Sequence, residues 1–437
     1  MNFSSFSPYG PCGRPDHLTR RTLLKGSAVA GLSWLTPLAR QLARGAESSG
    51  KRPKSVIILW MEGGASQLET FDPHPGTAIA YGGKAIPTSV KGIQFGEGLP
   101  LTAELANEFS ILRAVTSKEG DHSRATYNVK TGYRPFPGLV HPAIGSVICH
   151  EMPGAAGTEA AIDIPAHISI LPGQFPARGG YLGAQFDAFQ AYDPVTPVPD
   201  VKSRTDDDRE QRRFESLDLL ERSFASGRLA TLESERTLHR TSIERARKMM
   251  SSDQLAAFDV SAAPESERKP FGDTAFGRSC LAAIRLVEVG VRCVEVTLKG
   301  WDTHINNQEG QATQLAILDP ALSALIRLLK ERDLYDETIL MVATEFGRTP
   351  KQNVTEGRDH WPHGFSVLLG GGGFRHGLAI GETDPTGESK EPAGKVTVED
   401  IHTTIFHRLG IDTDYEFMTP IGRPIAVSEG RIIRELI

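Results

Sequence analysis

The sequence predicts an α/β protein with a mostly parallel central sheet flanked by helices. Short apolar runs rich in β-branched residues, such as "SVIILW" at 55–60 and "VRCVEVTL" at 291–298, lack polar alternation, which is typical of strands buried on both faces. In the C-terminal half, such runs alternate with helical patterns at 273–289 and 311–333. Strand and helix in alternation indicate a parallel sheet covered by helices.

The remaining elements follow the same signals. Strands are predicted at 109–115, 166–170, 337–347 and 365–373, and a last helix at 396–411 with Thr397 or Asp400 near its start. The segment 206–260 is rich in charge and has apolar residues at helical spacing, which favours a solvated amphipathic helix pair over a coiled-coil partner site. We therefore expect one domain over 47–437 with a helical insertion at 206–260.

Residues 1–46 differ in kind from the rest. Arg20 and Arg21 are followed by Leu23, Leu24 and Lys25 and by a weakly apolar stretch that ends near Ala46. This pattern predicts a twin-arginine export signal. Polar residues interrupt the stretch well short of the roughly 20 residues that a membrane span needs. We therefore expect a periplasmic or secreted protein that meets the membrane only during export.

Composition excludes several classes of function. The 437-residue chain has a net charge of −6, and a nucleic-acid partner is disfavoured because such proteins carry basic surfaces. Cys149, Cys280 and Cys293 lie in the chain after the signal without CxxC spacing, which predicts buried thiols and neither a disulfide framework nor a cysteine zinc site. Nothing in the sequence indicates an oligomeric state, so that property is unknown.

Carboxylates and imidazoles gather where the predicted strands end. They are Glu62, Asp302, His304 and Glu345, together with His360 and His363 from "GRDHWPHG" before the next apolar run. Because the carboxyl ends of parallel strands meet at one edge of a sheet, these side chains predict a metal site with oxygen and nitrogen ligands. That ligand set favours zinc or manganese over magnesium or calcium. The alternative is a set of loop caps and hydrogen-bonded structural histidines.

Four stretches carry a family resemblance: "GWDTH", "ATEFGRTP", "DHSRATYNVKTGYRP" and "LLGGGGF". Over 54–412 the chain resembles the exported, sulfatase-like family known as domain of unknown function fifteen-oh-one, within the alkaline phosphatase and sulfatase superfamily. The resemblance implies that Asp302 and His363 hold one metal, completed by His304 or Asn306. It also implies a second metal on Glu62 and Glu345.

The chain departs from the superfamily pattern at these positions. The superfamily typically has Asp in place of both Glu62 and Glu345, and a His directly after the later one, where this chain has Phe346. Asp121 or His122 would have to supply the missing ligand of the second metal.

The resemblance also bears on the nucleophile. "DHSRA" stands where sulfatases carry CxPSR, and the cysteine is absent. The resemblance then implies Ser123 as a hydroxyl activated by His122, and Arg124 as the holder of an anionic ester. The alternative is that Ser123 only caps the helix that starts "RATYNVK".

These observations together predict an exported, metal-dependent hydrolase of sulfate or phosphate esters that acts on a small-molecule or glycan ester. The alternative is a catalytically degenerate member that binds a polyanion or sulfated glycan, or serves in the cell envelope. Phe346 and the absent sulfatase cysteine support that alternative. The two hypotheses differ in whether the protein shows turnover that a chelator abolishes.

Overall fold

The computed structural model describes residues 54–153, 162–226 and 238–437. The predicted export signal, and with it the predicted location of the protein, falls on residues outside this part of the chain.

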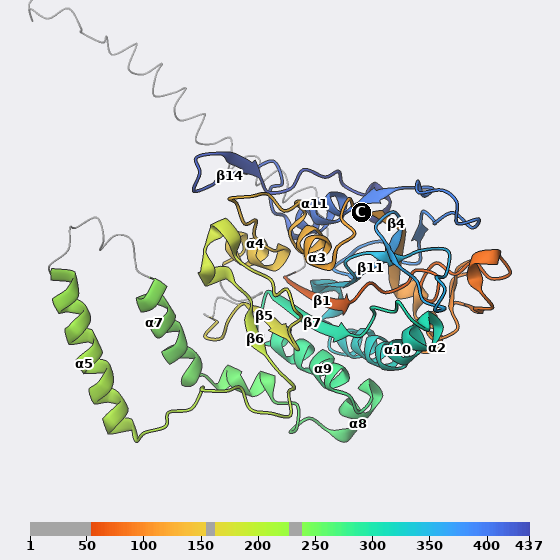
Figure 1. The fold of residues 1–437 in the computed structure, drawn as a ribbon. Coiled ribbons are helices and arrows are strands. Elements are labelled where there is room, and N and C mark those ends of the chain that lie inside the picture. The colour runs from red at the N-terminus through yellow and green to blue at the C-terminus, as the bar shows by residue number, and fades with distance from the viewer. Residues whose placement is uncertain (1–53, 154–161, 227–237) are drawn as a thin grey trace, which may run out of the picture. The chain divides into compact units, whose positions relative to one another are not determined.

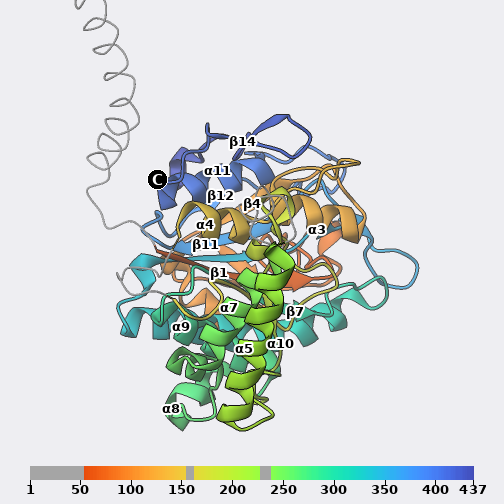
Figure 2. The ribbon, with the colours of Figure 1, turned by 90° about the vertical axis from the view of Figure 1, so that its left-hand side faces the viewer.

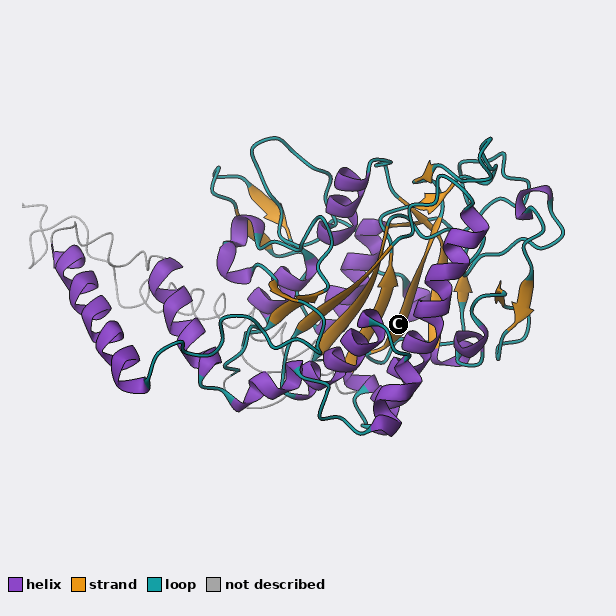
Figure 3. Ribbon diagram, turned by 60° about the horizontal axis from the view of Figure 1, so that its bottom comes forward, coloured by secondary structure: helices purple, strands orange, loops and turns teal. Residues whose placement is uncertain are grey.

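A nine-stranded sheet forms the centre of the fold, in the order β12-β4-β11-β8-β1-β7-β5-β6, with β13 beside β4. Its strands are β1 (Ser55–Glu62), β4 (Phe109–Thr116), β5 (His167–Ile170), β6 (Phe189–Ala191), β7 (Cys293–Lys299), β8 (Thr338–Ala343), β11 (Phe365–Gly371), β12 (Ala379–Ile380) and β13 (Val396–Thr397). Only β11 runs antiparallel to its neighbours. The prediction of a mostly parallel sheet is confirmed, and Figure 3 shows its strands between two groups of helices.

Both faces of the sheet are buried, which explains why its strands lack polar alternation. In β1, Ile57 and Leu59 face one hydrophobic core, and Val56 and Ile58 face the other. The first core is covered by α9 (Ala275–Glu288) and α10 (Asn307–Glu331), and the second by α3 (His122–Thr131), α4 (Ile144–Glu151) and α11 (Val398–Leu409). Figure 1 shows these two helix layers on opposite sides of the sheet.

Two helix starts bear on the sequence predictions. Thr397 caps α11 and Asp400 completes a capping box, so both proposed residues take part. In α3 the cap is Asp121, whose side chain accepts from the Arg124 amide. The prediction that Ser123 could cap this helix is wrong, because the helix begins two residues earlier than its sequence pattern suggests and Ser123 lies in the first turn.

Helix α10 is, within the described residues, the one helix long and apolar enough to cross a membrane by length and composition. Its most apolar window has a mean hydropathy of 1.4, and 61% of that window is buried inside the fold. Burial of this kind is what a core helix requires.

The predicted insertion contains α5 (Asp207–Ser226) and α7 (Leu238–Met250). The Arg247 guanidinium of α7 lies 4.2 Å from the centre of the Phe214 ring of α5, so the two helices touch at this pair. Figure 1 shows them side by side, and Figure 2 shows α5 in front of α7. Leu219 and Leu220 are exposed.

Short elements complete the fold: α2 (Pro100–Ala103), α8 (Glu265–Arg268), β2 (Ala85–Pro87), β3 (Gln94–Gly96), β9 (Gly347–Arg348), β10 (His360–Trp361), β14 (Glu416–Met418) and β15 (Pro424–Ala426).

Cys149, Cys280 and Cys293 are free and buried, as predicted. Burial raises the pKa of the Cys149 thiol to about 12, which makes it unreactive near neutral pH.

Candidate metal centre

The stretch "GWDTHINN" after β7 is a loop whose side chains alternate between burial and exposure. Trp301 and Thr303 are buried, whereas Asp302 is exposed and His304 is partly exposed. The Thr303 hydroxyl donates to Asn307 Oδ1 at 2.6 Å, at the start of α10. The buried residues thus anchor the loop, and Asp302 and His304 project from its other side.

Close backbone contact fixes this loop against the end of β1. Gly63 has φ +122°, and a Cβ there would lie 2.5 Å from the Asp302 amide nitrogen. Only glycine fits such an approach at that backbone angle. Because β1 pairs with both β7 and β8, the loops after these three strands meet at one edge of the sheet.

Three imidazoles surround the Asp302 carboxylate. Nε2 of His304 lies 3.2 Å and Nε2 of His360 3.5 Å from Asp302 Oδ1, and Nε2 of His122 lies 3.4 Å from Oδ2. The Nε2 atoms of His304 and His360 are 3.0 Å apart. His122 comes from the first turn of α3 and His360 from β10, so loops distant in sequence supply the four side chains.

The other nitrogen of each imidazole has its own partner. Nδ1 of His122 lies 2.8 Å from Glu345 Oε1, and Nδ1 of His304 lies 2.9 Å from Asp359 Oδ1. Nδ1 of His360 lies 2.8 Å from the Gly120 carbonyl oxygen. Carbonyl and carboxylate oxygens only accept, so each Nδ1 carries the hydrogen. In the neutral rings each Nε2 therefore presents a lone pair toward Asp302.

This donor set fits a divalent metal ion. Ligand atoms at about 2.0–2.2 Å from a tetrahedral metal lie roughly 3.3–3.6 Å from one another, close to the separations around Asp302. His122 Nε2 is buried without a hydrogen-bond partner among the described residues, and ligand atoms of His122, Asp302 and His360 all lie within 4.8 Å of one another. Facing lone pairs on His304 and His360 repel, and a cation between them removes that repulsion.

Electrostatics prepare two of these groups as ligands. For Asp302, burial disfavours the charged form, but the hydrogen bond and charge of Arg348 outweigh it and lower the pKa. Burial lowers the pKa of His360. Asp302 is therefore ionised and His360 neutral near pH 7, the forms that bind metals. The hydrogen bond to Glu345 raises the pKa of His122 despite its burial, so a proton competes with a cation at that ring.

Two buried side chains, Arg348 and Phe346, contact the residues of the centre on the side that faces the protein interior. Arg348 is 0% exposed and donates to Asp302 Oδ1 at 2.7 Å, to the carbonyls of Gly63 and Gly64, and to that of Arg358. The Phe346 ring stacks on His360 with centroids 4.3 Å apart. Phe346 thus supports an imidazole at the position where the superfamily pattern would have a ligand.

Sequence reasoning missed three of these residues: Arg348, Asp359 and the carbonyl group of Gly120. Arg348 lies within "ATEFGRTP" and Asp359 directly before His360, so a signal was present in stretches already singled out. An Arg beside a strand-end carboxylate, and a carboxylate beside a predicted ligand, are the pattern of groups that orient metal ligands.

The structure places some predicted metal ligands elsewhere. The His363 ring lies edge-on to Trp361 with centroids 4.9 Å apart, near the charges of Lys390 and Glu391. Asn306 adopts φ +47° at the start of α10, a left-handed conformation that Asn tolerates.

Glu62, the last residue of β1, and Glu345, which lies just after β8, form hydrogen bonds with other groups of the protein. Glu62 Oε1 accepts from the Gln174 amide at 2.7 Å. Glu345 is 0% exposed, and its Oε1 accepts from the Gly63 amide as well as from His122. Glu345 therefore orients an imidazole.

The predicted nucleophile and anion holder are engaged with other protein groups. The Ser123 hydroxyl donates to Asp121 Oδ1. Arg124 forms a two-point contact with Glu119, at 2.7 and 3.0 Å, and Arg134 contacts the same carboxylate. His122 is thus the residue of "DHSRA" that reaches the centre.

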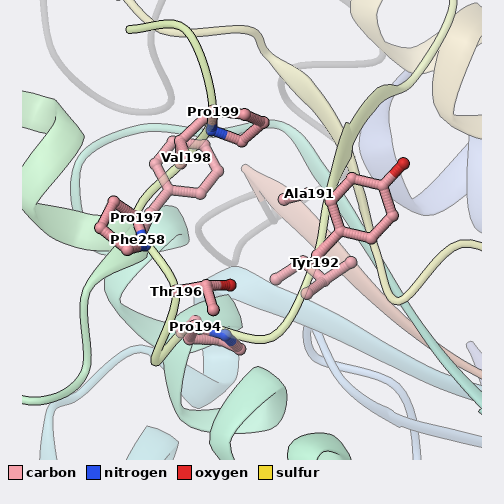
Figure 4. Close-up of a pocket in the computed structure, with 10 residues that line it drawn as sticks. Ala191, Tyr192, Pro194, Thr196, Pro197, Val198, Pro199 and Phe258 are labelled. Atoms are coloured by element: carbon pink, nitrogen blue, oxygen red, sulfur yellow. The ribbon is translucent and has the colours of Figure 1, made fainter. Parts of the chain in front are cut away.

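A separate small pocket lies at the ends of β5 and β6 (Figure 4), lined by Tyr192, Pro194, Pro197 and Phe258 among others. Its volume is about 20 Å³, which is room for about one water molecule. It does not accommodate an ester substrate.

Comparison with known proteins places the chain in a family. Residues 53–437 match the family described as Protein of unknown function (DUF1501). The chain belongs to this family. No curated protein matches it.

Solved structures similar to this DUF1501 chain share little sequence with it. Ps i-CgsB, in complex with k-i-k-neocarrahexaose, is 11% identical with a TM-score of 0.41, over 83% of this chain and 73% of that one. The lipoteichoic acid synthase LtaP from Listeria monocytogenes is 12% identical with a TM-score of 0.39, over 86% and 74%. The alkaline phosphatase from the Antarctic bacterium TAB5 is 12% identical with a TM-score of 0.38, over 83% and 99%.

Proposed function

We propose that this protein is a divalent-metal-dependent hydrolase of phosphate or sulfate esters, with His122, Asp302, His304 and His360 as the metal ligands. The observation that carries the proposal is the convergence of three imidazole Nε2 atoms on one carboxylate while every Nδ1 is hydrogen-bonded elsewhere. Metal-binding histidines have this arrangement, because a partner on the second nitrogen fixes the tautomer and the ring orientation.

A divalent ion held by these residues would supply Lewis acidity, which would lower the pKa of water bound to it and offset negative charge on the oxygens of an ester. The chain supplies the orientation. Glu345 and Asp359 hold the Nδ1 protons of His122 and His304, and Arg348 keeps the Asp302 carboxylate in place. Zinc or manganese suits three imidazoles and one carboxylate better than calcium does.

The candidate metal centre is open to solvent on one side only. The side chains of Asp302 and His304 are 46% and 43% exposed, so substrate and water reach them from solvent, whereas Phe346 and Arg348 close the inner side. Because Ser123 is bonded to Asp121, the proposal assigns the nucleophilic role to water. The reaction class, and export by the twin-arginine route, rest on the sequence motifs and the family resemblance.

The test is elemental analysis of the purified protein and three variants. We expect about one zinc or manganese per chain in the wild type, and loss of it in Asp302→Ala and His360→Ala. His363→Ala is the matched control, because that ring lies beside Trp361 and should leave metal content unchanged. Wild-type protein without metal after incubation with zinc and manganese, or metal lost in His363→Ala alone, contradicts the proposed ligand set.

Turnover is then measured on phosphate and sulfate esters, with and without a chelator. Hydrolysis that the chelator abolishes, and that Asp302→Ala lacks, supports the hydrolase. A stoichiometric metal without turnover on any ester instead supports the non-catalytic alternative, a glycan- or polyanion-binding member of the family.

A further inference from the structure

A cleft of about 510 Å³ adjoins the metal centre, in the range that small-molecule sites occupy. It is lined by Thr349, Pro350, Lys351, Gln352, Asn353, Asp359, Trp361, Gly387 and Glu388. Asp359, which holds His304 at 2.9 Å, belongs to both the cleft and the centre. A ligand in the cleft therefore lies next to the proposed reaction site.

The β9–β10 ribbon explains this adjacency. His360 pairs with Arg348, and Trp361 with Gly347. Successive side chains in a strand point to opposite sides, so His360 faces Asp302 while its neighbours Asp359 and Trp361 line the cleft. One short strand thus serves both the centre and the cleft.

The chemistry of the cleft is that of a site for a neutral polyhydroxylated ring. Trp361 lines the cleft and is only partly buried, and an indole ring is the kind of flat apolar surface on which the C–H face of a sugar packs. The side chains of Lys351, Gln352 and Glu388 have no hydrogen bond or ion pair with the described residues, so they are available to hydroxyl groups. Asn353 is not, because it holds the loop through His304 and Thr355.

The charges in the cleft and at the candidate metal centre suit different parts of a substrate. The cleft is lined by Asp359 and Glu388, which carry carboxylates, and by Lys351, which carries an ammonium group, and the ammonium group of Lys390 lies 5.9 Å from the Trp361 ring centre. Two charges of each sign give the cleft no preference for an anion. An anionic ester group is therefore directed to the metal centre, and the uncharged part of the substrate to the cleft.

We propose that this cleft binds a neutral sugar ring of a phosphorylated or sulfated glycan, stacked on Trp361, while its ester group lies at the metal centre. The inference rests on the proposed function for the ester group, but the sugar-binding cleft is testable without turnover.

The first experiment measures binding of lactose, maltose and cellobiose by saturation-transfer NMR to the metal-loaded protein. We expect binding by the wild type, retention in Trp361→Phe, and at least about a tenfold loss in Trp361→Ala and a smaller loss in Gln352→Ala. Gln352 has no partner in the described fold, so its replacement should leave the unfolding midpoint unchanged. Absence of binding by all three sugars, or equal binding by wild type and Trp361→Ala, overturns the proposal.

The second experiment compares the hydrolysis of galactose 6-sulfate with that of p-nitrophenyl sulfate, and the hydrolysis of glucose 6-phosphate with that of p-nitrophenyl phosphate. The ratio of kcat/KM for sugar ester to aryl ester should fall about tenfold in Trp361→Ala, through KM. An unchanged ratio overturns the cleft assignment. Sugar binding that depends on Trp361, without hydrolysis of any ester by the wild type, supports the cleft and contradicts the hydrolase, so the two failures are distinguishable.

Discussion

Two regions meet in the first turn of α3, and neighbouring residues of the motif "DHSRA" divide between them. His122 faces inward to Glu345 and Asp302. Asp121, Ser123 and Arg124 form an outer cluster with Glu119, in which each polar side chain has a partner. Successive residues on a helix point about 100° apart, so adjacency in the sequence separates these side chains. A motif of adjacent polar residues therefore does not by itself define one site.

The largest effect is expected from Arg348→Met, in the inner region formed by His122, Asp302, Glu345 and Arg348. It leaves three buried carbonyl groups without their donor and Asp302 without its cationic partner, which should lower the free energy of unfolding by about 3 kcal/mol or more. Urea denaturation measures this loss, and metal content should fall with it.

Arg327→Met is the matched control for that variant. Arg327 forms an exposed pair with Glu104, and exposed pairs contribute about 1 kcal/mol or less. Equal destabilisation by the two substitutions would show that the buried network around Arg348 has no special role.

A second prediction compares the two carboxylates that orient imidazoles. Glu345→Gln should weaken metal binding by about 10–100-fold, because the amide oxygen can still accept from His122 and Gly63 but the negative charge that makes the His122 imidazole a more basic ligand is lost. Asp359→Asn should cost less, since Asp359 is 58% exposed and water can take its place. Competition with a chromogenic chelator gives both affinities, and a larger loss in Asp359→Asn would contradict this order.

A third prediction concerns the support of α3 and its dependence on pH. His402 of α11 is fully buried, with Nε2 2.8 Å from the Val129 carbonyl oxygen of α3, and burial lowers its pKa to about 4. An unfolded His has a pKa near 6.5, so the unfolded chain binds more protons between these values. The stability that neutral His402 contributes is present above about pH 6.5 and decreases as pH falls toward 4.

The slope from this one residue reaches at most about 1.4 kcal/mol per pH unit. Urea denaturation of wild type and His402→Gln between pH 4 and 7 measures it, and the variant should show a shallower dependence. The same slope in both proteins would remove His402 as the cause.

The smallest effects should come from the outer cluster. Ser123→Ala and Arg124→Ala should leave metal content, metal affinity and ester turnover at wild-type values, because their partners Asp121 and Glu119 lie in the outer cluster. Elemental analysis and the ester assays of the proposed function check this. Loss of turnover with retained metal in Ser123→Ala would restore the serine nucleophile that the family resemblance implies.

Much of the fold was predictable because its signals are local. The apolar runs at 55–60 and 109–115 became β1 and β4, since period and β-branching determine a strand buried on both faces. The capping residues Thr397 and Asp400 likewise act within one helical turn. The gathering of Asp302, His304 and His360 also followed from sequence, because parallel strands deliver their following loops to one edge.

Tertiary structure decided which of the polar residues lie at the candidate metal centre and which contact other parts of the protein. His122 joins the centre while Ser123 does not, Glu345 orients an imidazole, and His363 packs beside Trp361. Each outcome depends on where loops separated by many residues place their atoms to within about an ångström, and local sequence carries no such distance. The sequence by itself determined which strands and chemical groups are present, and packing between distant segments decided which nitrogens and oxygens face one another.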